Sequence, residues 1–335
     1  MPAGLPTGVV LSLKNPQTSV EFGFELALAA HLESDEAVLS RQLGASVHGR
    51  RVMDLVRIEP GPEFEKRVSL TAETIPPAAI RSDVGPGRAR YWKEAFDCHP
   101  ERAQRATEEA IERGFFERER QGGRTYVRQA TRYPDWVGRI VGIENKPDLG
   151  RPGALETQLL TDVKLGLLDA VVLATASHVT GAHRNRIPDE VGIWRFDPET
   201  GEQRLLREPS RLPVEQPGVE ILDRSSAQTE IRIASPGAKA RARLALAERA
   251  YGKGWRTYEM PACARVDPDE DGLPVCPWKG RVVRPATDCG PDCGGHDPAE
   301  PPAFDPAQLR AARTAWEADP DGQTRRQVDL GRFFE

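Results

Sequence analysis

Glu144 and Lys146 stand one residue apart in the segment GRIVGIENKPDL, where β-branched residues predict a strand that stops at Pro147. Alternate residues of a strand point to the same face, so the carboxylate and the ammonium are expected to share one site. With an Asp from a neighbouring strand, such a pair can hold one or two Mg²⁺ ions, because hard divalent cations prefer oxygen ligands. The lysine would help to generate hydroxide for in-line attack, so the spacing predicts metal-dependent phosphodiester hydrolysis.

Two aspartates are candidates for the acidic partner of Glu144. Asp54 lies in RRVMDLVRI, a β-rich run that is followed by the breaker Pro60, whereas Asp135 lies in YPDWVGRIVGIENK with eight residues between it and Glu144. That gap leaves little room for a two-stranded hairpin, so strand geometry favours Asp54. Asp135 stays as the alternative ligand.

The elements that must position these residues are indicated by the spacing of apolar side chains. The expected order is helix, strand, strand, helix, strand, strand. In chain order these elements are residues 21–34, 51–58, 138–147, 154–169, 170–176 and 191–196. The order predicts an α/β fold that carries Asp54 on one strand and Glu144 on the next.

The segment between the Asp54 and Glu144 strands has a different character. Three short helices are expected to precede a hairpin whose turn is the Gly122-Gly123 pair, a layout that resembles a winged helix-turn-helix. Four arginines of the hairpin are candidates for contacts to nucleic-acid phosphates: Arg118, Arg120, Arg124 and Arg128. Glu117 and Glu119 dilute their charge, so winged helices that bind protein are the alternative.

The C-terminal third contains a basic helix and a cysteine-rich segment. Residues 239–256 carry six Lys or Arg and one Glu, which fits either a nucleic-acid surface or a solvated helix face. From Pro261 to Pro302 the composition shifts to Pro, Gly, Asp and Cys, and such a segment needs a staple to be ordered. Four of the five cysteines lie there: Cys263, Cys276, Cys289 and Cys293. Four thiolates predict a structural Zn²⁺ site.

Composition excludes several classes of protein. The 335 residues are 39% hydrophobic and 29% charged, with a net charge of −5, so no overall cationic field draws the protein to nucleic acid and any such contact must be local. No apolar run is long enough to span a membrane, and the first basic residue is Lys14, so a cytoplasmic protein without a membrane partner is expected. The chain contains no GxxxxGK[ST], GxGxxG or GxSxG motif.

From Glu21 to Phe196 the chain resembles the PD-(D/E)XK, or restriction-endonuclease-like, superfamily. That family has an α-β-β-β-α-β core with an Asp on the second strand and Glu-x-Lys on the third, which match Asp54, Glu144 and Lys146. The resemblance implies supporting roles for an acidic residue on the first helix and a Gln on the helix after the motif, matched by Glu25 and Gln158. It also implies Mg²⁺ or Mn²⁺ as cofactor, and an iron-sulfur cluster as the alternative occupant of the four cysteines.

Five segments of the chain resemble a haloarchaeal family of unknown function, which implies a high-salt cytoplasm. They are FGFELALAAHLE, GPGRARYWKEAFDCHPERA, GIENKPDLGRPGALE, VTGAHRNRIPDEVGIWRFDPETGE and YGKGWRTY.

We expect a nuclease core in two parts, residues 18–62 and 132–234, with a winged-helix insertion at residues 63–131. Residues 235–335 would hold the basic helix, the cysteine-rich region and a final helix. The predicted function is a Mg²⁺-dependent DNase in DNA repair or defence, with DNA as its partner. The alternative is a non-catalytic DNA-binding regulator that uses the winged helix.

Overall fold

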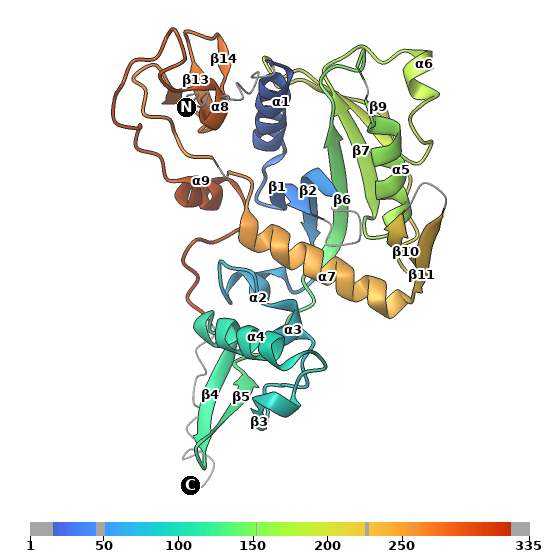
Figure 1. The fold of residues 1–335 in the computed structure, drawn as a ribbon, viewed down its shortest axis with the longest axis vertical. Helices are drawn as coiled ribbons and strands as arrows, with labels where there is room; N and C mark the ends of the chain where they lie inside the picture. The colour runs from blue at the N-terminus through green and yellow to red at the C-terminus, as the bar shows by residue number, and fades with distance from the viewer. Residues whose placement is uncertain (1–15, 45–50, 152, 225–227, 257, 323–335) are drawn as a thin grey trace, which may run out of the picture. The chain divides into compact units, whose positions relative to one another are not determined.

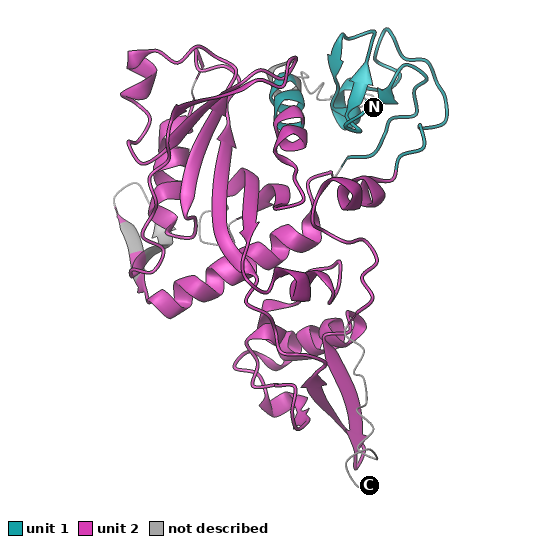
Figure 2. Ribbon diagram, turned by 180° about the vertical axis from the view of Figure 1, so that it is seen from behind, with its two compact units in different colours: residues 1–26, 258–304 teal, residues 27–257, 305–335 magenta. Residues whose placement is uncertain are grey.

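The computed structural model describes residues 16–44, 51–151, 153–224, 228–256 and 258–322. Two compact units divide it: residues 258–304 with the chain up to residue 26, and residues 27–257 with the chain from residue 305 (Figure 2). The second unit contains the strands that carry Asp54 and Glu144.

A six-stranded mixed sheet forms the centre of the second unit (Figure 1). Its strands, in spatial order, are β1 (Val38–Gly44), β2 (Val52–Pro60), β6 (Val137–Asn145), β7 (Ala170–Thr175), β8 (Gly192–Phe196) and β9 (Gln203–Arg207). The pairs β1/β2, β2/β6 and β8/β9 are antiparallel, whereas β6, β7 and β8 run parallel. The fold is therefore mixed α/β. All six residues of β7 are buried, as a central parallel strand requires.

Outside the inserted segment, the described residues form three helices of 11 or more residues. The expected first helix is α1 (Pro16–Leu32), and the expected helix after the Glu-x-Lys segment is α5 (Leu155–Leu165). α5 ends earlier than the predicted residue 169, because Gly166 adopts a left-handed conformation with φ of 63° and stops the helix. The third helix, α7 (Pro236–Lys253), packs along β1, while α5 packs against β7 and β10 (Gly218–Arg224), and β10 pairs with β11 (Thr229–Ala234).

The basic side chains of α7 mostly bond to the protein itself. Lys239 is only 4% exposed, and its ammonium donates to the carbonyl oxygens of Pro213 and Gln216 at 3.1 and 2.8 Å. Arg243 donates to the Asp169 carboxylate at 2.6 Å. These contacts favour a structural role for the helix over a nucleic-acid surface.

The inserted segment has its own small core and sheet. Its elements are α2 (Phe64–Val68), α3 (Pro77–Ile80), β3 (Arg90–Tyr91), a 3₁₀ turn (Trp92–Glu94), α4 (Pro100–Glu112), β4 (Phe116–Gln121) and β5 (Arg124–Gln129). The strands pair in the order β3-β5-β4, and Phe115, Phe116 and Val127 are among the buried residues of its core. Gly122 and Gly123 form the predicted turn, with φ of 56° and 78°.

The first unit contains the cysteine-rich segment and has little regular structure. Three short strands form its sheet: β12 (Asp267–Pro268), β13 (Pro274–Cys276) and β14 (Arg281–Val282). The short helix α8 (Pro285–Asp288) follows them, and α9 (Pro306–Arg313) belongs to the second unit. No helix among the described residues of either unit is long and apolar enough to cross a membrane.

Candidate functional site

The antiparallel pairing of β2 with β6 sets Asp54 beside Glu144. Leu55 pairs with Ile143 and Val56 with Gly142, so continuation of this register places Asp54 opposite Glu144 and on the same face. The backbone N–H of Asn145 donates to Asp54 Oδ2 at 2.9 Å, which holds that carboxylate against β6. The structure thus brings together the two acidic residues that the sequence favours as metal ligands.

Lys146 follows at the end of β6. Its backbone N–H donates to the Ala174 carbonyl at 2.9 Å, which continues the parallel ladder with β7 beyond Asn145. Its positive charge opposes the rise that burial causes in the pKa of Glu144.

Asp162 on α5 and Arg51 before β2 also belong to this cluster. Neither is among the site residues that we predict from the sequence. Arg51 donates from Nε to Asp162 Oδ1 at 2.8 Å and from Nη2 to Asp162 Oδ2 at 2.6 Å. The same Nη2 donates to Glu144 Oε2 at 2.5 Å. Asp162 lies one helical turn after Gln158, but the ion pairs join residues 93 and 111 positions apart, so no local pattern could have indicated Arg51.

Burial controls the ionisation of this cluster. The side chains of Arg51, Glu144 and Asp162 are 12%, 6% and 4% exposed. Burial raises the pKa of Glu144, and the Asp162 charge raises it further, whereas Arg51 and Lys146 oppose the shift. Burial likewise raises the pKa of Asp162 against the effect of Arg51, and the two carboxylates raise the pKa of the guanidinium. The buried acids therefore depend on a nearby cation to stay ionised.

Gln42 on β1 is a further neighbour of Asp54. Its side-chain amide lies 3.4 Å from Asp54 Oδ1. Gln42 has a φ of 51°, a left-handed conformation that non-glycine residues rarely adopt, and the Lys253 ammonium donates to its carbonyl. Strained backbone of this kind is often found beside functional sites. The sequence could not reveal it, because β1 itself was not predicted.

The two supporting residues lie in different places. Gln158 is half-buried on α5, one turn before Asp162. Glu25 is 5% exposed on α1, in the part of that helix that belongs to the first compact unit. The other predicted core residues all belong to the second unit.

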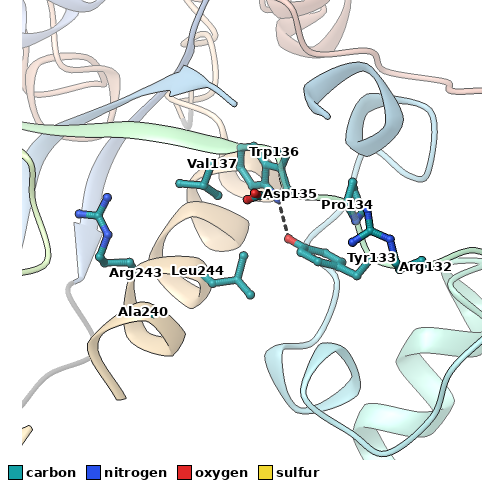
Figure 3. A pocket seen from close by; sticks show the side chains of 9 residues that line it. All are labelled: Arg132, Tyr133, Pro134, Asp135, Trp136, Val137, Ala240, Arg243 and Leu244. Carbon is teal, nitrogen blue, oxygen red and sulfur yellow. Dashed lines mark hydrogen bonds between the residues drawn. The ribbon is translucent and has the colours of Figure 1, made fainter. Parts of the chain in front are cut away.

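Asp135 lies at the opposite end of β6 from Glu144. The strand residues from Val137 to Glu144 alone span roughly 23 Å at about 3.3 Å per residue. Asp135 lines a separate pocket of about 410 Å³ with Arg132, Arg243 and Trp136, whose indole donates to the Tyr133 hydroxyl at 2.5 Å (Figure 3). Asp135 therefore cannot share a metal ion with Glu144 in this fold.

The four hairpin arginines do not form one surface. Alternation along β4 puts Arg118 and Arg120 on one face, and the cross-strand register puts Arg124 and Arg128 on the other. Arg128 is paired with Glu117 at 2.6 Å and with Glu119 at 2.8 Å. Arg118 and Arg120 are exposed and share a face, so they fit a phosphate contact better than Arg128 does.

The four predicted cysteine ligands gather in the first unit. Cys263 and Cys276 are buried in one cluster with Val266 and Val283, and Cys289 packs against it. Burial raises the pKa of the Cys289 thiol to about 11, and charge at Cys263, Cys276 and Cys293 adds to that shift. All five cysteines are free thiols. The fold thus brings Cys263 and Cys289, which lie 26 positions apart, into one cluster.

Within the described part of the chain, no three His, Cys, Asp or Glu side chains are arranged to hold a metal ion. In the cluster around Asp54 and Glu144, the Arg51 guanidinium lies between the Glu144 and Asp162 carboxylates and donates to both. The donor chemistry still suits a hard divalent cation, since adjacent strands offer carboxylates on one face. Such a site can bind a cation, polarise a phosphate ester or keep a closed ion-pair network.

Fold and site together define a mixed α/β protein with a buried cluster of carboxylates and cations at the end of two sheet strands. The chain belongs to a family of unknown function (DUF5787), whose model matches residues 38–298. No curated protein and no solved structure matches it.

Proposed function

We propose that this protein is a metal-dependent DNase of the PD-(D/E)XK type. The observation that carries the proposal is the placement of Asp54 opposite Glu144 on paired strands, with Lys146 directly after the end of β6. Two carboxylates on one face and a lysine close to them in the chain are the residue types that metal-assisted phosphodiester hydrolysis needs.

The order of elements supports the proposal. With the insertion set aside, the chain runs α1, β1, β2, β6, α5, β7, which is helix, three antiparallel strands, helix and a strand parallel to the third. This is the α-β-β-β-α-β order of the restriction-endonuclease-like core. A fold-level likeness is weaker support than the site, because one fold hosts many functions.

Each residue has a definite task in this proposal. Asp54 and Glu144 would hold Mg²⁺ or Mn²⁺, and the bound ion supplies Lewis-acid chemistry and a more acidic water. Lys146 would orient the attacking water and offset negative charge near Glu144. Gln158 would support the site, and Arg118 and Arg120 of the hairpin would contact DNA phosphates outside it.

Cleavage of linear, circular and single-stranded DNA with Mg²⁺, Mn²⁺ or EDTA tests the proposal. The buffer contains high KCl, because the sequence resembles a haloarchaeal family. Wild-type protein should cut at least one of these substrates with metal and none with EDTA. Loss of a carboxylate ligand, as in Asp54→Asn, should slow cutting by at least about 100-fold. Absence of cutting with either metal would contradict the proposal.

A non-catalytic DNA-binding regulator is the second candidate. The observation that favours it is the closed ion-pair network of Arg51, Glu144 and Asp162, which satisfies both carboxylates without a metal. The inserted segment, with helices followed by a β4–β5 hairpin, has the layout of a winged helix. Helix α4 carries Glu101, Glu108, Glu109 and Glu112 against Arg102 and Arg105, so DNA contact would fall to the hairpin. DNA binding without cleavage would support this candidate.

We also propose a structural Zn²⁺ ion for Cys263, Cys276, Cys289 and Cys293, with an iron-sulfur cluster as the alternative. Cys263, Cys276 and Cys289 lie in one cluster of a unit with a small apolar core, which supports the proposal. Metal analysis of anaerobically purified protein should find about one zinc per chain, and a Cys276→Ser variant should lose it, whereas Cys98→Ser should not. Bound iron with visible absorption would favour the cluster. Neither metal in the wild-type protein would contradict both.

A further inference from the structure

Arg51 occupies the centre of the acidic site. Its Nη2 lies 2.5 Å from Glu144 Oε2 and 2.6 Å from Asp162 Oδ2, and its Nε lies 2.8 Å from Asp162 Oδ1. All three side chains are at least 88% buried. A guanidinium so placed engages one oxygen of the carboxylate that a metal ion at Glu144 would bind.

The two halves of this ion-pair network differ in strength. Asp162 receives two parallel N–H bonds from Arg51, the bidentate geometry that fits a guanidinium best. Glu144 receives one bond, and the positive charge of Lys146 also acts on it. The Arg51–Glu144 contact is therefore the one that a competing cation can break while Arg51 stays on Asp162.

We propose that Arg51 is an exchangeable cation of the metal site. With a divalent ion present, Glu144 would leave the guanidinium to ligate it, Asp162 would keep Arg51 beside the site, and the N–H freed from Glu144 would donate to a phosphate oxygen of the substrate. The inference rests on the proposed function and adds to it a substrate-contacting residue.

Calorimetric titration with Mn²⁺ tests the exchange without any measurement of activity. If the open state of the wild-type site is populated at about one tenth, removal of the competitor should tighten binding about tenfold in Arg51→Met. Arg51→Lys keeps a counter-ion for the buried acids but cannot make the forked contact, so it should fold and show an intermediate gain. Glu144→Gln defines the binding that depends on this site.

Affinity for a short oligonucleotide in Ca²⁺ tests the phosphate contact. Arg51→Met should bind DNA about tenfold more weakly than wild type, as expected for loss of a charge-assisted hydrogen bond. Arg139→Met, at the far end of β6 and 43% exposed, is the matched control and should bind like wild type. Opposite changes in the two titrations are the expected result, because a merely structural role for Arg51 would weaken both.

Three outcomes would contradict the inference in different ways. Unchanged or weaker Mn²⁺ binding in both Arg51 variants, with binding lost in Glu144→Gln, overturns the exchange and leaves the metal site in place. Equal oligonucleotide affinity of wild type and Arg51→Met overturns the phosphate contact. Equal Mn²⁺ binding by wild type, Glu144→Gln and Arg51→Met overturns the inference and the proposed metal site together.

Discussion

Asp54 and Asp135 carry the same side chain, but the sheet gives them different neighbours. Asp54 is held to the Glu144 strand by the Asn145 N–H, and Asp135 lies at the other end of that strand. We predict that Asp54→Asn slows Mg²⁺-dependent DNA cleavage by at least about 100-fold and that Asp135→Asn leaves the rate within about threefold of wild type. Single-turnover cleavage rates measure both, and the reverse pattern would refute the assignment.

The spacing of residues along one strand was enough to find Glu144 and Lys146, because alternation fixes which side chains share a face. The same reasoning could favour Asp54 but could not prove it, since the register of β2 on β6 depends on residues from both strands. Strand alternation could not indicate Arg51. The partners of Arg51 lie on β6 and α5, and only the tertiary fold brings these three residues together.

A buried ion pair links the inserted segment to the core. Arg67 on α2 and Glu248 on α7 are both fully buried, with 2.6 Å between Arg67 Nε and Glu248 Oε1, and the guanidinium stacks on Tyr251 at 3.9 Å. We predict that Arg67→Met destabilises the protein by about 3–5 kcal/mol, because it leaves a carboxylate buried without its cation.

Urea unfolding of three variants checks this prediction. The double variant Arg67→Met/Glu248→Leu should recover much of the loss, since it removes both charges. Arg90→Met is the matched control: it breaks an exposed pair with Asp83 and should cost less than about 1 kcal/mol. If Arg67→Met lowers the free energy of unfolding by less than about 1 kcal/mol, the ion pair does not stabilise the packing of α2 on α7.

Glu63 joins the two ends of the inserted segment, where the chain leaves the core sheet and where it returns to it. This carboxylate accepts hydrogen bonds from Lys66 at 2.5 Å, from the Asp135 N–H at 2.7 Å and from Arg132 at 2.6 Å. The bonds from Lys66 and from the Asp135 N–H, together with Arg132, lower the Glu63 pKa from 4.5 to about 2. A lowered folded-state pKa gives stability that is present above about pH 4.5 and is lost as the pH falls toward 2.

We predict that Glu63→Gln is less stable than wild type at pH 7 and that the difference shrinks between pH 4.5 and pH 2.5. Thermal unfolding across that range measures it. Glu65→Gln, an exposed acid on α2, is the control and should follow the wild-type profile. A difference that stays constant with pH would mean that the Glu63 charge does not stabilise this junction.

Elements were predictable where their pattern is regular. The apolar run of β7 predicts a strand and the spacing of apolar residues in α5 predicts a helix. The Gly122-Gly123 pair predicts the hairpin turn. β1 was missed because its sequence VLSRQLG has three polar residues in succession, although Ser40 and Arg41 are buried. The end of α5 was misplaced because Leu167 and Leu168 continue the apolar pattern after Gly166 but pack in the core outside the helix.

At the scale of the whole molecule, the chain belongs to a family of unknown function and combines a mixed sheet, an insertion and a cysteine-rich unit. The expected class of fold, α/β, is confirmed. Composition could exclude a general cationic surface, but it could not show that the basic residues of α7 bond inside the protein. Their partners lie in loops with no sequence signal of their own.

The cleavage rate of wild type beside Glu144→Gln and Glu59→Gln, with Mg²⁺ and with EDTA, tests the central claim most directly. Glu59 lies on β2 at the other end of the β2–β6 pairing and is the matched control. We expect Mg²⁺-dependent cutting by wild type and Glu59→Gln and a loss of at least about 100-fold in Glu144→Gln. Equal cutting by all three proteins, or no cutting by the wild type, would contradict it.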